Sequence, residues 1–193
     1  MRELYLECYS GISGDMTVAA LLDLGVPGEY LMKELEKLHL DGYEIKISKT
    51  KKNQITATDF DVILKDEHKE EHGHEHVHTH VNDEDVKECH EQEHSQEHTH
   101  VHNSYREIKE FILASKLSDR VKEMILKIFQ VIAEAEAQVH GTAVDEVHFH
   151  EVGAVDSIVD ISAAAICLDY LGFDSIVTSE IWEGKGHVWC QHG

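Results

Sequence analysis

The sequence predicts an α+β fold: a single domain over residues 1–193 in which helices pack on a mixed sheet of about five strands. Short segments of alternating apolar and polar residues predict the strands, and longer runs with helical periodicity separate them. Between the two halves, residues 66–103 change composition abruptly, which predicts a disordered, histidine-rich loop. A chain of 193 residues is long enough to bury a core around such a sheet.

The first part of the chain predicts three strands and two helices. Residues 3–9 alternate and predict a strand. The apolar periodicity of residues 16–24 predicts a helix, and residues 28–38 predict a second, amphipathic one. Residues 43–48 and 55–64 predict two strands that a polar turn joins into a hairpin.

The second part predicts three helices and two strands. Residues 105–114 and 118–139 have the apolar stripes of a short and a long helix. A strand that carries two histidines follows, and then an apolar helix from about residue 154 to residue 171. Residues 175–181 predict the last strand.

The net charge of the chain limits the kinds of molecule that it can bind. The chain has 38 acidic and 17 basic residues and a formal net charge of -21. Such a charge argues against binding nucleic acid or an anionic membrane and favours binding cations. The amino-terminal residues contain carboxylates where a signal peptide needs an apolar run, which predicts a cytoplasmic protein. Whether the protein forms a homo-oligomer stays open.

Residues 147–160 are the densest group of candidate functional side chains. In an extended segment His148 and His150 share one face, opposite Val147 and Phe149. In the helix that follows, Asp156 and Asp160 lie one turn apart on an otherwise apolar helix. Imidazole suits nickel, zinc or copper and carboxylate suits manganese or magnesium, so this group predicts a divalent-metal or acid–base site. The alternative is structural, because a helix dipole favours acidic residues in its first turns.

A glycine-rich turn precedes the first helix. Ser10, Gly11, Ser13 and Gly14 form a loop whose backbone N–H groups could approach a phosphate or carboxylate. The loop matches neither the Walker pattern nor the full dinucleotide fingerprint. Asp15 follows it and is expected to cap the helix, either as a structural residue only or as part of a site.

The histidine-rich segment is a second candidate metal site. Residues 66–103 contain eleven histidines, twelve carboxylates and two lysines, and no core can form from them. Alternating imidazoles in a flexible chain favour copper, nickel and zinc, so the segment predicts a metal collector and not a reaction centre. The alternatives are a pH-responsive linker or a sequence that is tolerated because it is disordered. Its alternating histidines are His74, His76, His78, His80, His98, His100 and His102.

Four segments together resemble a known family. They are Ser10-Gly-Ile-Ser-Gly-Asp-Met, the histidine-rich loop, His148-Phe-His-Glu-Val-Gly-Ala-Val-Asp-Ser-Ile-Val-Asp160, and a closing Cys190-Gln-His-Gly193. In this order they resemble the nickel insertion proteins known as LarC. The resemblance covers nearly the whole chain, and it implies that this chain is the N-terminal half of a longer protein.

The resemblance implies a specific reaction. Nickel would be inserted into pyridinium-3,5-bisthiocarboxylic acid mononucleotide by a lyase-class cyclometallase, with formation of one nickel–carbon and two nickel–sulfur bonds. It implies CTP, used through the C-terminal half, a supporting manganese or magnesium ion, and lactate racemase apoenzyme as recipient of the nickel-pincer cofactor. Loss of the ring proton needs a base, for which Glu151 or a histidine is the candidate.

Two other functions remain open, as does the arrangement of the site. The residues also fit a metal-dependent phosphohydrolase, or a nickel or zinc store built on the loop. Cys190 and His192 could add ligands or a nucleophile. Because junctions from parallel strands to helices gather at one sheet edge, we expect Asp15 to meet the segment from His148 to Asp160 in space.

Overall fold

The computed structural model describes residues 1–65, 104–149 and 152–186. The histidine-rich loop predicted at 66–103 lies outside the described residues. In chain order the elements are β1 (Glu3–Leu6), α1 (Gly14–Asp23), α2 (Gly28–Leu35), the 3-10 helix η1 (Glu36–Leu38), β2 (Tyr43–Lys52), β3 (Ile55–Leu64), α3 (Tyr105–Ala114), α4 (Asp119–His140), the 3-10 helix η2 (Val144–Glu146), α5 (Val155–Leu171) and β4 (Ser175–Thr178).

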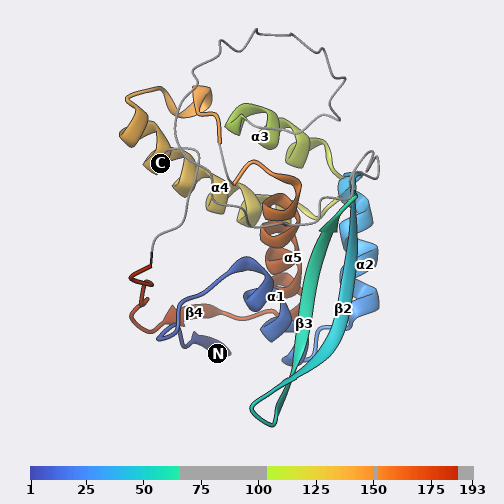
Figure 1. Cartoon of the computed structure of the whole chain (residues 1–193). Coiled ribbons are helices and arrows are strands. Elements are labelled where there is room, and N and C mark those ends of the chain that lie inside the picture. Colours follow the sequence, from blue (N-terminus) through green and yellow to red (C-terminus); the bar gives the residue numbers. More distant parts are fainter. Residues whose placement is uncertain (66–103, 150–151, 187–193) are drawn as a thin grey trace, which may run out of the picture.

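The predicted α+β class is confirmed, but the single five-stranded sheet is wrong. The described strands form two sheets of two strands each: β1 pairs with β4 in parallel, and β2 pairs with β3 antiparallel. The long hairpin packs against α1 and α5 and does not extend the β1–β4 sheet (Figure 1). The predicted histidine strand makes one isolated bridge, between His148 and Ser104, because its neighbours on both sides are helices and turns.

Helix α5 is the centre of the fold. It contacts α1, α2, α4 and β3 (Figure 1). Its side chains are apolar on most of its circumference, which is typical of a helix surrounded by other elements. Ile158, Val159, Ala163 and Ile166 are fully buried in it. A carboxylate in the middle of this helix therefore needs an explanation, because burial disfavours its charged form.

The helix ends follow local chemistry that the sequence contains. Ser104 and Glu107 form a reciprocal capping box at the start of α3. The Ser118 hydroxyl accepts a hydrogen bond from the Val121 N–H at the start of α4. Gly141 and Gly172 end α4 and α5 in the left-handed conformation, which glycine adopts without steric cost. These positions agree with the predicted helix boundaries to within a residue or two.

The β1–β4 sheet leaves much apolar surface uncovered. Tyr5, Ile176 and Val177 are between 42% and 56% exposed. A groove of about 410 Å³ lies between β1 and α1, and Met16 and Leu24 of α1 line it. No helix among the described residues is long and apolar enough to cross a membrane.

Candidate metal centre

The start of α1 lies directly against Asp160 of α5. A methyl group added at Gly14 would come within 2.8 Å of the Asp160 Cγ atom, closer than side chains tolerate. Glycine is therefore required at this position by close approach, although its backbone angles are ordinary. The contact joins two segments that lie far apart in the sequence, and only the missing side chain of Gly14 permits it.

Asp15 is the second residue of α1 and does not cap it. Ser13 occupies the N-cap position, and the Thr17 N–H already donates to the Ser13 carbonyl at 3.0 Å. The expectation that Asp15 would be the N-cap is therefore wrong, because the helix begins at Gly14, two residues before its apolar pattern. The Asp15 carboxylate instead accepts a hydrogen bond from the Ser13 hydroxyl.

The carboxylates of Asp15, Asp156 and Asp160 form a carboxylate group at this crossing of α1 and α5, near enough for the charges of the first two to act on the third. Burial first, and then the negative charges of Asp15 and Asp156, raise the pKa of Asp160 to about 6. The backbone N–H of Asp15 acts in the opposite direction. The Asp160 Oδ1 atom is buried and has no hydrogen-bond partner. Among the described residues no Lys, Arg or His forms an ion pair with this carboxylate group.

This arrangement favours a cation over a phosphate at the start of α1. The expected phosphate site relied on the N–H groups of Ser10 to Gly14 and the first turn of the helix. The Asp160 carboxylate lies against that first turn, so a phosphate there would meet three negative charges. Oxygen donors of this kind suit magnesium or manganese. Within residues 1–65, 104–149 and 152–186, however, no group of three or more metal-binding side chains has the geometry to hold an ion.

The rest of the glycine-rich loop borders the apolar groove. Gly11 has a φ of 84° and donates its N–H to the Cys8 carbonyl at 3.1 Å, which makes a tight turn after β1. Gly11 and Ile12 line the groove between β1 and α1. Ser10 is exposed beside them. A ligand lying in this groove would therefore contact the loop from its apolar side.

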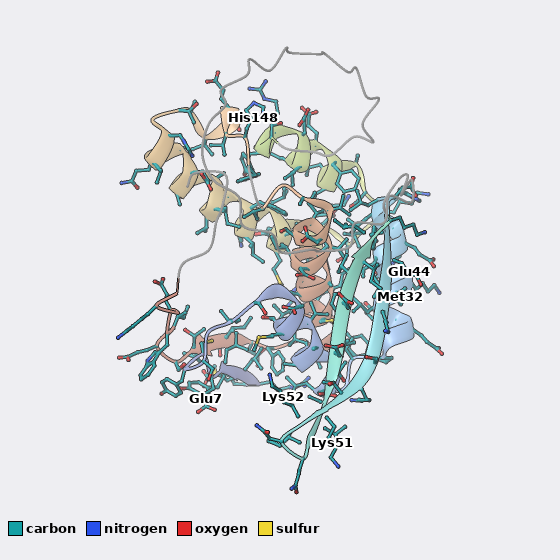
Figure 2. The ribbon with its side chains drawn as sticks, viewed as in Figure 1. Glu7, Met32, Glu44, Lys51, Lys52 and His148 are labelled. Atoms are coloured by element: carbon teal, nitrogen blue, oxygen red, sulfur yellow. The ribbon has the colours of Figure 1, made fainter. Side chains whose placement is uncertain are left out.

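His148 lies in a different part of the molecule. Val147 and Phe149 are 2% and 3% exposed and His148 is exposed, so the predicted alternation is confirmed for these three residues. Figure 2 shows His148 beside α3 and α4 and away from α1. It lines pockets with residues of α3, η2 and the end of α4, and Asp15, Asp156 and Asp160 line neither of them.

Several predicted site residues lie outside the described part of the chain. They are His150, Glu151, Cys190, His192 and the seven alternating histidines of the 66–103 segment. The structure thus brings Gly14 and Asp15 near Asp160, with the Asp156 charge close enough to act on Asp160. It does not bring the described histidine, His148, to the same place.

Comparison with known proteins identifies the family, which the geometry of the site alone does not show. The family model described as "Nickel insertion protein" matches residues 4–193. The chain belongs to the nickel insertion protein family. The resemblance drawn from the four sequence segments is thereby confirmed. No solved structure matches the chain.

Curated relatives are similar to this chain along its whole length. Two are named pyridinium-3,5-bisthiocarboxylic acid mononucleotide nickel insertion protein. The one from Alkaliphilus metalliredigens is 52% identical over all of this chain and 42% of its own length. The one from Clostridium acetobutylicum is 56% identical over all of this chain and 46% of its own length. The chain therefore spans less than half the length of these relatives.

His140 is a candidate metal ligand that the sequence did not single out. It is the last residue of α4, its Nε2 atom lies 3.2 Å from the Glu136 carboxylate, and it lines a pocket with His148. The signal was present in the sequence: a histidine at a helix end before Gly141, eight positions before His148. Histidine in the last turn also has an ordinary explanation in the helix dipole, so the position alone does not predict a ligand.

Proposed function

We propose that this chain is part of a protein that inserts nickel into pyridinium-3,5-bisthiocarboxylic acid mononucleotide. The observation that carries the proposal is the family match over residues 4–193, together with relatives about half identical to the chain whose names include this mononucleotide. Nickel is here a substrate, and the product is the nickel-pincer cofactor. The enzyme would be a cyclometallase of the lyase class.

The carboxylate group at the α1–α5 crossing is our candidate for the supporting manganese or magnesium ion. Three facts support this role: the charges of Asp15 and Asp156 act on Asp160 without a counter-charge among the described residues, Asp160 has a raised pKa, and its buried Oδ1 has no partner there. Asp15 and Asp156 are exposed and Asp160 is partly buried, and a cation beside Asp160 would offset the repulsion between their like charges. When bound, the divalent ion would supply positive charge beside a substrate that carries a phosphate.

The roles of the base, the substrate phosphate, CTP and the recipient protein are proposed from the chemistry of the reaction alone. Nickel–carbon bond formation requires that a pyridinium ring proton leave, so a base must lie beside the ring. Glu151, His150 and His148 are our candidates for it. The substrate phosphate would reach the supporting ion from the side of the Ser10 to Gly14 loop. CTP would be used by the part of the protein that the relatives have beyond this stretch. Lactate racemase apoenzyme would receive the nickel-pincer cofactor in the cytoplasm.

The proposed ion site can be tested on the chain itself with manganese. Mn²⁺ binds imidazole less strongly than nickel, copper or zinc do, and residues 66–103 are the same in the native chain and in both variants. A difference in Mn²⁺ binding between these chains therefore does not arise from that segment. We expect electron paramagnetic resonance to show loss of the free Mn²⁺ signal with the native chain. Asp160→Asn should weaken binding at least about tenfold, since it removes a charged oxygen ligand. Asp61→Asn, at an exposed position of β3, is the matched control and should bind like the native chain.

The function itself is tested in the complete polypeptide. Asp160→Asn should abolish formation of the nickel-pincer product, followed by mass spectrometry, while thermal unfolding shows that the protein still folds. Asp61→Asn should leave product formation unchanged. Product formation at the native rate by Asp160→Asn would remove the carboxylate group from the reaction. Failure of the unmodified polypeptide to consume the mononucleotide with nickel and CTP would reject the proposed function.

A further inference from the structure

The end of α4 and the segment after η2 bring two histidines to one pocket. Helix α4 ends at His140, and Gly141, with a φ of 65°, turns the chain away from the helix axis. After η2 the chain returns in an extended conformation, with Val147 and Phe149 anchored in the core. His148 therefore projects outward beside the helix end. The two imidazoles, with Thr142 and Val147, line a cavity of about 390 Å³.

The surroundings of this pair are suited to a cation. The Glu136 carboxylate lies 3.2 Å from the Nε2 atom of His140. A carboxylate on one ring nitrogen orients an imidazole and raises the basicity of the other, as it does in many metal sites. The last carbonyl groups of α4 place the negative end of the helix dipole here. Asp145 and Glu146 line the adjoining pocket with His148, where Arg106 is the basic neighbour.

We propose that His140 and His148 form a divalent-metal site, separate from the carboxylate group at the α1–α5 crossing. Two imidazoles select a borderline ion such as Ni²⁺ or Zn²⁺, whereas three carboxylates select Mg²⁺ or Mn²⁺. The two sites would therefore bind different kinds of metal, because their ligand types differ and they lie in different parts of the molecule. Water or further side chains would complete the coordination of the ion. That this ion is the nickel destined for insertion rests on the proposed function; that the site binds metal does not.

The site can be tested by chemical footprinting of the intact chain. Diethyl pyrocarbonate modifies imidazole nitrogens that are not coordinated, and mass spectrometry of peptides reads each histidine separately. Saturating Ni²⁺ at pH 7 should lower the modification of both His140 and His148 at least about fivefold, because coordination occupies the reactive nitrogen. Excess nickel over the eleven histidines of the 66–103 segment removes competition from that segment. Mg²⁺ at the same concentration should protect neither residue.

Single substitutions decide whether the two histidines act together. In His148→Asn, nickel should no longer protect His140, and in His140→Asn it should no longer protect His148. His39→Asn is the control: His39 is an exposed residue with a φ of 55°, which asparagine also adopts readily, and its replacement should leave both protections intact. Both pocket residues lie at the surface, and thermal unfolding checks that the variants fold. Glu136→Gln gives a second variant that leaves both imidazoles in place and should weaken protection.

The outcomes separate this inference from the proposed function. Protection of one histidine that persists after the other is replaced would reject a shared site, as would no protection by nickel in the native chain. Asp160→Asn should leave the protection by nickel unchanged, since the carboxylate group is a separate site. A polypeptide that makes the nickel-pincer product without protecting His140 and His148 would keep the proposed function and reject this site. If nickel protects both histidines but the polypeptide makes no nickel-pincer product, the metal site is kept and the proposed function is rejected.

Discussion

The Asp160 carboxyl group occupies the space that a side chain at position 14 would need, so only glycine fits there. We predict that Gly14→Ala lowers the free energy of unfolding by about 1–3 kcal/mol, since the new methyl must displace Asp160 or the start of α1. Urea denaturation measures the change. Gly184→Ala is the control, because nothing lies within 4 Å of a side chain there. Combining Gly14→Ala with Asp160→Ala should recover part of the loss, and equal losses with and without Asp160→Ala would show that the contact is not the cause.

Asp160 gives the stability of the chain a specific dependence on pH. Its pKa is about 6 in the folded protein and near 3.8 when unfolded, so folding favours the protonated form. Stability is therefore greatest below pH 4 with respect to this group and falls as pH rises through 6. We predict that Asp160→Asn is more stable than the native chain at pH 7 by about 1 kcal/mol, after allowance for solvent screening. The difference should disappear below pH 4.

Manganese should reverse this difference. An ion that binds the folded native chain and not the variant stabilises the native chain by mass action. In a series of thermal unfolding curves at pH 7, added Mn²⁺ should raise the midpoint of the native chain and leave that of Asp160→Asn unchanged. If Mn²⁺ raises both midpoints equally, the ion binds elsewhere.

At the scale of elements, Asp23 fastens the end of α1 to the hairpin. Its carboxylate accepts hydrogen bonds from the Lys49 ammonium at 2.5 Å and from the Thr58 N–H at 2.9 Å. The hydrogen bonds from Lys49 and Thr58 lower the pKa of Asp23 to about 2. Because α1 carries Asp15 and Gly14 at its other end, this contact helps to fix the helix that brings them to α5.

Asp23→Asn tests this connection between the elements. We predict a loss of at most about 1 kcal/mol at pH 7, because the carboxylate is partly exposed and screened by solvent. A depressed pKa contributes stability above pH 4 that is lost as pH falls toward 2. The difference in urea midpoint between native and variant chains should accordingly shrink between pH 4 and pH 2. A difference that stays constant over this range would exclude the charge of Asp23 as its source.

For the whole molecule, the positions of the helices could be predicted from the sequence, and the pairing of the strands could not. Capping residues such as Ser118 and Gly141 act locally, so the chain contains the information that places a helix end. The pairing of strands depends on which elements lie between them, and here α1 and α5 separate the hairpin from β1. Residues 147–149 alternate as a strand does, yet helices on both sides leave them only one bridge.

One contact of the candidate site was predictable from the sequence, and the position of its histidine was not. Strand-to-helix junctions gather in space, so the approach of Asp15 to the segment from His148 to Asp160 could be expected, and its contact is with Asp160. The distance of His148 from that contact could not be predicted, because it depends on how η2 redirects the chain. His140 was missed for a related reason: a histidine in the last turn of a helix has a purely structural explanation until the fold brings a second imidazole beside it.

The pairing of β1 with β4 has a consequence for how the protein is synthesised. Glu3 lies opposite Ser175, and the Asp174 N–H donates to the Arg2 carbonyl at 2.8 Å. Strand β1 therefore lacks its partner until the ribosome has translated residues 175–178. Contacts between such distant parts of a chain form slowly, and an unpaired apolar strand is prone to aggregation while it waits. During most of the translation of this stretch, Leu4 and Leu6 therefore lack the neighbouring strand that they have in the folded chain.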